Sequence, residues 1–190
     1  QAVKVHASYE SLVADPKVDI VYVGTITRLH KEHSLLAIRA GKAVLCEKPL
    51  CENAADAKEL YAEAEAKGVF LQEGMWTRFF PAMEHARSLL SSGELGKVRQ
   101  VFAEFPDQCY AVQCAFFGFG SDAVPSEVKT VPGGALMQFG EEGCALASFP
   151  SWKCEYAERA EITCERGRIS LGPVGHCPSS LEVSRTPKEL

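Results

Sequence analysis

The first part of the chain alternates short apolar runs with stretches that have helical spacing. Residues 20–23 and 43–46 are apolar and uninterrupted, which is typical of buried strands. Between them, residues 31–41 carry apolar positions at helical spacing and end at Gly41, a suitable helix C-cap. A strand, a helix and a strand in this order predict a βαβ unit with parallel strands and a right-handed crossover.

The pattern changes character near residue 92. A longer helix is expected from Asn53 to Gly68, then a third parallel strand at 69–71 and an amphipathic helix at 81–92. Beyond it the chain alternates as half-buried strands do, and the expected strands are 98–105, 145–149, 161–164, 169–171 and 181–183, with only 110–117 helical. We predict an α/β protein: a Rossmann-like parallel sheet in residues 1–92, and an α+β domain with a mostly antiparallel sheet in residues 93–190.

Composition narrows the class of protein. The chain has 190 residues, of which 46% are apolar and 24% charged, as in ordinary globular proteins. A net charge of −5 provides no basic field for nucleic acid or an anionic membrane, so small neutral or polar ligands fit better. No apolar stretch reaches the roughly 18 residues of a membrane span, and the first residues do not resemble a signal peptide. We therefore expect a cytoplasmic location.

The eight cysteines do not have the spacing of a metal site. They stand at 46, 51, 109, 114, 144, 154, 164 and 177, and none forms a C-x-x-C pair. Cys46 and Cys114 lie within apolar runs, where free thiols act as small hydrophobic groups. We expect reduced structural cysteines and no bound metal.

The most informative stretch follows the strand at 43–46, which runs directly into Glu47, Lys48 and Pro49. The carboxyl ends of parallel strands border the ligand crevice of an open sheet, so this position offers the Glu-Lys pair to a ligand. Pro49 restricts Lys48 to extended conformations and so helps to aim its side chain. The alternative for so short a motif is an ordinary solvated turn.

Separate stretches of the chain share a family resemblance. They are Ser8-Tyr9-Glu10, the strand ending at Gly24 with His30 beyond it, residues 40–49 with Glu-Lys-Pro, and Arg78-Phe79-Phe80-Pro81. Together they resemble the glucose-fructose oxidoreductase and inositol dehydrogenase (Gfo/Idh/MocA) family. Within that family, residues 74–81 are most similar to the dihydrodiol dehydrogenases, which are dimeric and also oxidise D-xylose with NADP.

The resemblance implies an activity and its partners. It implies a nucleotide-binding domain followed by an α/β domain whose open sheet supports a homodimer. It also implies hydride transfer between the nicotinamide of NADP, with NAD as the other option, and a carbon of a trans-dihydrodiol or a D-xylose-type sugar. The expected partner is thus a small molecule.

The resemblance also assigns residues. Lys48 would lie by the reacting hydroxyl and the nicotinamide ribose, and Tyr110 is a candidate acid or base. The expected cofactor-binding residues are Thr25, His30, Glu47, Lys48 and Pro49, and the expected substrate pocket contains Trp76, Arg78 and Phe79. Oxidation of an alcohol requires loss of a hydroxyl proton, which a lysine or tyrosine with a shifted pKa can accept.

Several of these residues have structural alternatives. His30 could cap or pack at a loop–helix junction, and Tyr110 could be a core residue of its helix. Trp76 and Arg78 could form an aromatic and basic seam between domains.

The sequence departs from the family pattern in two places. No G-x-G-x-x-G occurs, although that turn holds the pyrophosphate, so the parallel sheet is expected to be a truncated one. Before Cys109 the family has a longer segment with an aspartate near the lysine; here Pro106 stands at that place and Asp107 is displaced by one residue. The alternative function is therefore an incomplete, inactive copy that acts at most as a dimerisation partner.

Overall fold

The computed structural model describes residues 3–150, 158–172 and 174–186. The chain divides into two compact units, Gln1–Met75 (the first unit) and Trp76–Leu190 (the second unit). The expected fold class is confirmed, because a parallel sheet is followed by a mostly antiparallel one. Helix α4 (Pro81–Ser91), which the sequence analysis placed in the first domain, groups with the second unit.

The first unit is built on three parallel strands. They are β1 (Ile20–Val23), β2 (Ala43–Cys46) and β3 (Leu71–Glu73), in the order β1-β2-β3. Helices α1 (Tyr9–Val13), α2 (Thr27–Arg39) and α3 (Ala54–Lys67) complete it. Ile38, Val44 and Leu60 are fully buried in its core, so α2, β2 and α3 share one apolar interior. The predicted βαβ unit is confirmed.

Two boundaries in the first unit differ from the expected ones. Helix α2 begins at Thr27 rather than residue 31, because Leu29 N already donates to Ile26 O at 2.9 Å. Ile26 at the N-cap supplies no capping side chain, which leaves the helix start without its usual sequence signal. Strand β3 runs from Leu71 to Glu73 rather than over 69–71, since its ladder with β2 begins at the pair Val44 and Leu71 and continues to Cys46 and Glu73.

The second unit contains a seven-stranded sheet. Its strands are β4 (Val98–Glu104), β5 (Glu127–Val131), β6 (Gly134–Phe139), β7 (Gly143–Ser148), β8 (Arg159–Cys164), β9 (Gly167–Leu171) and β10 (Leu181–Arg185). Their order is β10-β9-β8-β4-β7-β6-β5, and among the described strand pairs of this sheet β4–β7 alone is parallel. The sequence pattern did not identify β5 and β6. Every residue of β5 is exposed, so that edge strand lacks the alternation by which strands are recognised.

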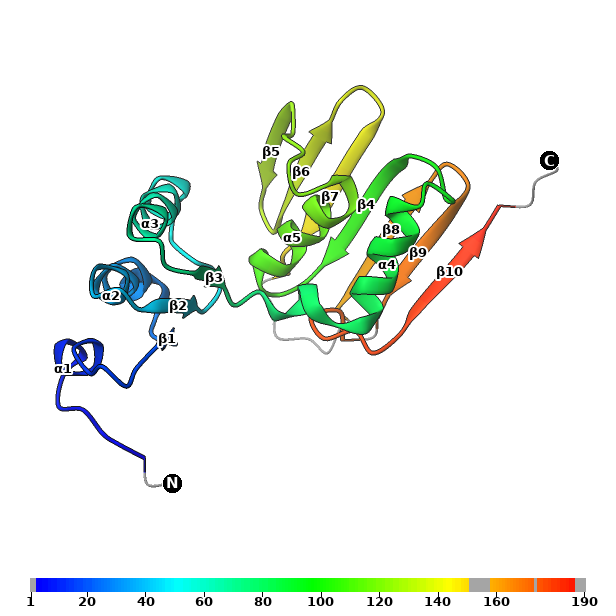
Figure 1. Ribbon diagram of the computed structural model, residues 1–190. Coiled ribbons are helices and arrows are strands. Elements are labelled where there is room, and N and C mark those ends of the chain that lie inside the picture. The colour runs from blue at the N-terminus through cyan, green and yellow to red at the C-terminus, as the bar shows by residue number, and fades with distance from the viewer. Residues whose placement is uncertain (1–2, 151–157, 173, 187–190) are drawn as a thin grey trace. The chain divides into compact units, whose positions relative to one another are not determined.

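The two faces of this sheet have different surroundings. Figure 1 shows α4 and α5 (Gln108–Phe119) on one face. On that side Val101, Ala145 and Ile162 are fully or almost fully buried. Gly118 lets α5 approach closely, because a Cβ atom there would lie 2.5 Å from Val101 Cγ2. The opposite face carries Leu136 and Leu146, which are 42% and 40% exposed.

The described cysteines are all free thiols, as expected, and Cys154 lies outside the described residues. Burial raises the pKa of Cys46 to about 11 and that of Cys114 to about 12. Both thiols are therefore protonated near neutral pH and behave as apolar side chains. Among the described residues, no helix has the length and apolar character needed to cross a membrane.

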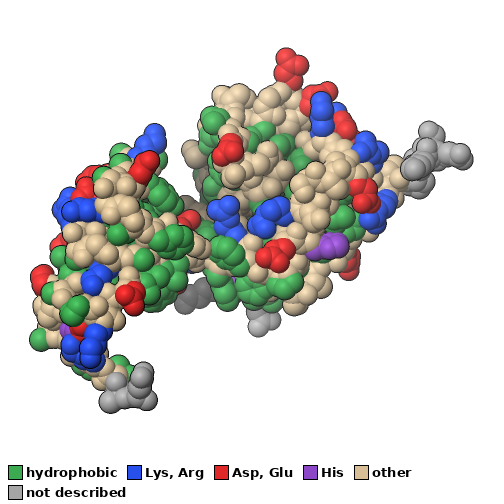
Figure 2. Space-filling view, in the orientation of Figure 1, with side chains coloured by type: hydrophobic (Ala, Val, Ile, Leu, Met, Phe, Trp, Pro, Cys, Tyr) green, Lys and Arg blue, Asp and Glu red, His purple; other side chains and the backbone are tan. Residues whose placement is uncertain are grey.

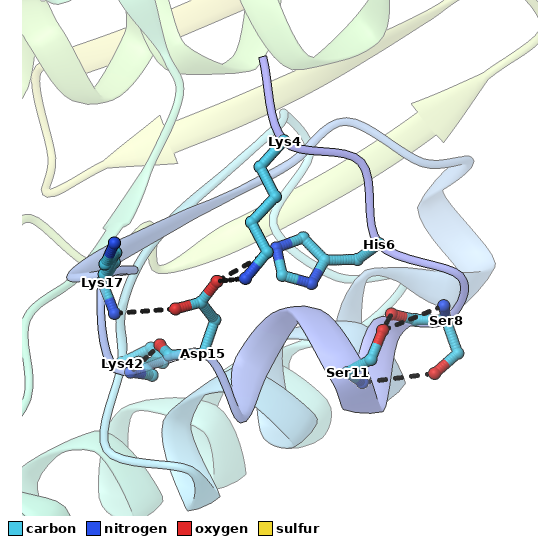
Figure 3. A network of polar contacts seen from close by, with 7 residues as sticks. All are labelled: Lys4, His6, Ser8, Ser11, Asp15, Lys17 and Lys42. Carbon is cyan, nitrogen blue, oxygen red and sulfur yellow. Dashed lines mark hydrogen bonds and ion pairs between the residues drawn. The ribbon is translucent and has the colours of Figure 1, made fainter. Parts of the chain in front are cut away.

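A buried carboxylate ties the N-terminal segment to the first unit (Figure 3). Asp15 follows α1, and its carboxylate accepts hydrogen bonds from the Lys4 side chain and, at 2.9 Å, from Lys17 N. His6 Nε2 lies 3.4 Å from the same carboxylate, and Lys42 Nζ donates to the backbone oxygen of Asp15 at 3.0 Å. Asp15 thus joins the segments before α1 and before β2.

This carboxylate should make the stability of the first unit depend on pH. The hydrogen bonds from Lys4 and Lys17 lower the pKa of Asp15 to about 2, below the value of about 3.9 in unfolded chains. A lowered folded-state pKa means that the contribution is complete above about pH 4 and is lost as the pH falls towards 2. We expect Asp15→Asn to lower the urea midpoint at pH 7 and to flatten its decline between these pH values.

The matched control for that experiment is Asp19→Asn, since Asp19 is exposed and lies in the same loop region. It should keep the wild-type dependence of the urea midpoint on pH, followed by circular dichroism. Parallel profiles for wild type and Asp15→Asn would contradict the role given to Asp15.

Candidate functional site

The polar residues after the three parallel strands meet at one edge of the sheet. Glu47 N donates to Val23 O at 2.9 Å, and Gly74 N donates to Cys46 O at 2.6 Å. Gly74 is needed for this approach, because a Cβ atom there would lie 3.2 Å from Cys46 O. Lys48, which follows Glu47, is partly buried at this edge. The strand-end position predicted for the Glu-Lys pair is therefore observed.

The carboxylates of this edge hold the backbone that carries Lys48. Glu47 accepts from the Tyr22 hydroxyl, and its other oxygen accepts from Lys48 N at 3.1 Å. The hydrogen bond to Glu47 raises the pKa of Tyr22. Glu73 Oε1 accepts from Leu50 N at 2.8 Å. Hydrogen bonds to carboxylates thus hold the loop at Lys48 and at Leu50. The observed role of Glu47 is to hold this backbone and to accept from Tyr22.

His30 links the loops that follow β1 and β2. It lies in α2 and is 1% exposed. Its Nδ1 is 2.8 Å from Pro49 O and its Nε2 is 2.9 Å from Thr25 O. A neutral imidazole has one N–H and can donate to one carbonyl at a time, whereas the doubly protonated ring donates to both. His30 therefore positions two segments that the sequence analysis assigned to the cofactor, by contacts with their backbone.

The side chain of Thr25 has its own partner. Thr25 Oγ1 lies 3.2 Å from His33 Nδ1, one turn further along α2 than His30. Tyr22, His33 and Glu73 were not among the predicted site residues. A sequence signal for Glu73 was present, because polar residues follow the apolar run of β3 as they follow that of β2.

A second group of predicted residues meets in the second unit. Trp76 Nε1 donates to the Tyr110 hydroxyl at 2.7 Å. Trp76 belongs to η1 (Trp76–Phe79) and is 48% exposed, whereas Tyr110 on α5 is 8% exposed. The Phe105 ring lies 6.0 Å from the Tyr110 ring. Tyr110 thus packs as a core residue through its ring and is hydrogen-bonded through its hydroxyl.

His176 and Glu158 adjoin this pair and were missed by the sequence analysis. The His176 ring lies 5.7 Å from the Trp76 ring and 5.6 Å from the Tyr110 ring. Its Nδ1 contacts the carboxylate of Glu158, and its backbone oxygen accepts from the Thr77 hydroxyl. The segment around His176 has no periodic pattern, so no sequence signal connected it to the aromatic residues.

The other expected pocket residues lie elsewhere in the second unit. Arg78 lines a groove with Arg87 and Gln113, while Trp76 contacts Tyr110. Phe79 is 60% exposed. Asp107 caps α5, because its side chain accepts from Cys109 N at 3.1 Å. Within the described ranges, no group of three or more His, Cys, Asp or Glu side chains has the arrangement of a metal site.

Residues 1–75 match a family model described as an oxidoreductase family with an NAD-binding Rossmann fold, GFO_IDH_MocA. This range coincides with the first unit, Gln1–Met75.

Relatives among characterised proteins extend the match beyond residue 75. The chain is 53% identical over 102 residues to a trans-1,2-dihydrobenzene-1,2-diol dehydrogenase of Bos taurus, which covers 54% of this chain and 30% of the bovine protein. It is 35% identical over 219 residues to the protein of the same name from Oryctolagus cuniculus, covering 98% and 66%. The second alignment is longer than the 190 residues of this chain, so the rabbit protein has internal segments without a counterpart here.

Solved structures give the same result for the fold. The chain is 25% identical to KijD10, a 3-ketoreductase from Actinomadura kijaniata solved in complex with NADP, with a TM-score of 0.77 and coverage of 95% of this chain and 64% of that one. An aldose-aldose oxidoreductase from Caulobacter crescentus, 20% identical, has a TM-score of 0.74 over 96% of this chain and 67% of that chain, which is a likeness of fold.

The burial of His30 and its contacts with two backbone carbonyls predict a measurable contribution to stability. We expect His30→Ala to lower the free energy of unfolding by about 2 to 4 kcal/mol, because it leaves a cavity and removes the donor of a buried carbonyl group. Urea unfolding would measure this. The exposed His85 provides the control, and His85→Ala should change the free energy by less than about 0.5 kcal/mol. Equal effects of the two substitutions would contradict the linking role.

Proposed function

Since the chain belongs to the Gfo/Idh/MocA oxidoreductase family, we propose that it acts in hydride transfer between a nicotinamide cofactor and a carbon of a small alcohol. The observation that carries the proposal is the placement of Glu47, Lys48 and Pro49 at the carboxyl end of β2, in a parallel sheet. Ligands of open parallel sheets bind at that edge. The chain spans between 30% and 66% of the length of the bovine and rabbit relatives, so this activity is a proposal for the chain.

The residues at this edge fit the nicotinamide half of a dinucleotide. When bound, the cofactor would supply the hydride acceptor or donor, and the protein would supply position and charge. Lys48 lies at this edge between the segments of Thr25 and Pro49, whose backbone oxygens contact His30, and Gly74 allows the chain after β3 to approach Cys46 there. For the pyrophosphate the 190 residues contain no G-x-G-x-x-G turn.

Two side chains would handle the proton of the substrate. An ammonium group at Lys48 would orient the reacting hydroxyl and stabilise the negative charge that develops as its proton leaves. Tyr110 would exchange a proton with the substrate oxygen, with Trp76 Nε1 fixing the direction of the phenol. Arg78 and Phe79, exposed beside Trp76 in the sequence, would contribute to substrate binding.

The relatives support a proposal for the substrate and the cofactor. We propose a trans-dihydrodiol or a D-xylose-type sugar as substrate, supported by relatives named dihydrodiol dehydrogenases. NADP is favoured over NAD because the ketoreductase KijD10 was solved with NADP. A cytoplasmic location is supported by the free thiols of the described cysteines, which reducing compartments preserve.

The proposal is tested by nucleotide binding and by turnover. Titration of the purified chain with NADPH, followed by nucleotide fluorescence, should give saturable binding. With NADP and a trans-dihydrodiol or D-xylose, Lys48→Ala should lower kcat by a factor of about 10² to 10⁴. The control is Lys58→Ala, an exposed residue of α3, which should retain turnover. Retained turnover in Lys48→Ala would remove Lys48 from the mechanism.

A second candidate function is a non-catalytic subunit that pairs with another copy. Absence of the glycine-rich turn from the sequence favours it. NADPH titration separates the two functions, because no binding at millimolar NADPH would support the non-catalytic subunit and overturn the enzymatic proposal.

Both functions include a homodimer formed through the open face of the second-unit sheet. Leu136 pairs with Leu146, and Leu146 pairs with Phe102, so three apolar side chains form a row across β6, β7 and β4. Arg159 lies over the Phe102 ring at 5.2 Å, and Glu161 is the strand neighbour of Phe102 on β8. An apolar row bordered by charges of both signs suits a second copy related by a two-fold axis.

The dimer has its own test. Leu146→Glu places a charge in the centre of the apolar row, and we expect it to shift the sedimenting species from dimer to monomer in analytical ultracentrifugation. Ser88→Glu adds the same charge on α4, on the other face of the sheet, and should leave the dimer intact. A monomeric wild-type chain would contradict this proposal.

A further inference from the structure

A groove in the second unit lies among η1, α4 and α5. Its volume is about 370 Å³, and its walls include Arg78, Arg87, Gln113, Phe116, Phe117 and Ser121. None of the described lining residues is acidic, and neither Trp76 nor Tyr110 is among them. Figure 2 shows basic side chains on the face of the second unit that α4 and α5 cover. The groove is therefore separate from the aromatic cluster around Tyr110.

The two arginines of the groove have no acidic partner. Neither guanidinium forms an ion pair with a carboxylate in the part of the chain that the structure describes, in contrast to Arg99, which contacts two glutamates. Arg87 is held in place, because its Nη2 donates to Arg78 O at 3.0 Å and its guanidinium lies 5.5 Å from the centre of the Phe117 ring. Its remaining N–H groups are available to a ligand.

Gln113 provides an independent indication of a ligand. Its Nε2 and Oε1 atoms are buried, and neither has a hydrogen-bond partner among the described residues. Buried polar atoms in native proteins almost always have partners, supplied by protein, water or ligand. Gln113 Nε2 is a donor without a partner, and the two neighbouring guanidinium groups have no carboxylate partner among the described residues, so all three suit a negatively charged acceptor.

The rest of the groove is compatible with such a group. Gly120 and Ser121 place it near the carboxyl end of α5, whose dipole corresponds to about half a negative charge. The two positive charges of Arg78 and Arg87 exceed that value. Phe116 and Phe117 add apolar walls that suit a flat hydrocarbon.

We propose that this groove is a binding site for a small organic oxyanion, a carboxylate or a phosphate monoester carried on a flat apolar group. Arg78 and Arg87 contact the charged oxygens, as guanidinium groups do with both kinds of anion. Gln113 Nε2 donates its missing hydrogen bond to a charged oxygen of the ligand, and the phenylalanine rings pack against the apolar part. The groove residues belong to the second unit, whereas the residues of the proposed cofactor edge belong to the first.

Calorimetric titration of the purified chain tests this site with three probes. Phenyl phosphate and benzoate carry the two candidate oxyanions, and benzyl alcohol is the neutral analogue. We expect saturable binding of at least one anion, at least tenfold weaker binding of benzyl alcohol, and a loss of about tenfold in anion affinity in Arg87→Gln. The anion with the higher affinity identifies the oxyanion. Arg168→Gln, an exposed residue of β9 in the same unit, should bind as wild type does.

A second variant guards against an effect on folding. In Gln113→Leu an unsatisfied amide is replaced by an apolar side chain of similar size, so the urea midpoint should stay equal or rise while anion affinity falls about tenfold. The proposal is overturned if neither anion binds, if benzyl alcohol binds equally well, or if Arg87→Gln leaves the affinity unchanged. A large drop in the urea midpoint of Gln113→Leu would also overturn it, because it would show that the amide already has a protein partner. None of these outcomes depends on NADPH binding.

Discussion

The parallel ladder of β1, β2 and β3 is the constraint on which the first unit depends. Because the three strands run in one direction, the polar residues after each of them arrive at one edge. The backbone bonds of Glu47 to Val23 and of Gly74 to Cys46 continue the ladder past the strands. His30 contacts one backbone oxygen in the loop after β1 and another in the loop after β2. The backbone of Lys48 and of Leu50 is held by the carboxylates of Glu47 and Glu73, so the position of this loop is fixed by its neighbours.

The sequence was sufficient for the fold class and for the elements with strong periodicity. The apolar runs of β1 and β2, with a helix between them, have few alternative structures, so the βαβ unit was predictable. The start of α2 was not, since Ile26 gives no capping signal. Strand β5 was missed for a related reason: a fully exposed edge strand carries no burial pattern, and its pairing depends on β6 rather than on its own residues.

The candidate site was predictable only where function and strand ends coincide. Glu47 and Lys48 could be selected as candidates because they directly follow the apolar run of β2. His176 and Glu158 could not, because they meet Trp76 and Tyr110 only through the fold of the second unit, far apart in the chain. The groove of Arg78 and Arg87 has the same origin, since residues of η1, α4 and α5 form it together. Residues that come together only in the folded chain have no regular spacing in the sequence by which they could be recognised.

The outermost strand of the second-unit sheet has a consequence for self-association. Glu127 and Lys129 form an ion pair of 3.1 Å on β5, where all five residues are exposed. Charged side chains on an outer strand oppose the addition of a further strand from another molecule, because its peptide groups would have to displace hydrated charges. The charged side chains of β5 therefore oppose polymerisation by strand addition at this edge of the sheet. A second copy of the chain would therefore not be expected to continue the sheet hydrogen bonds beyond β5.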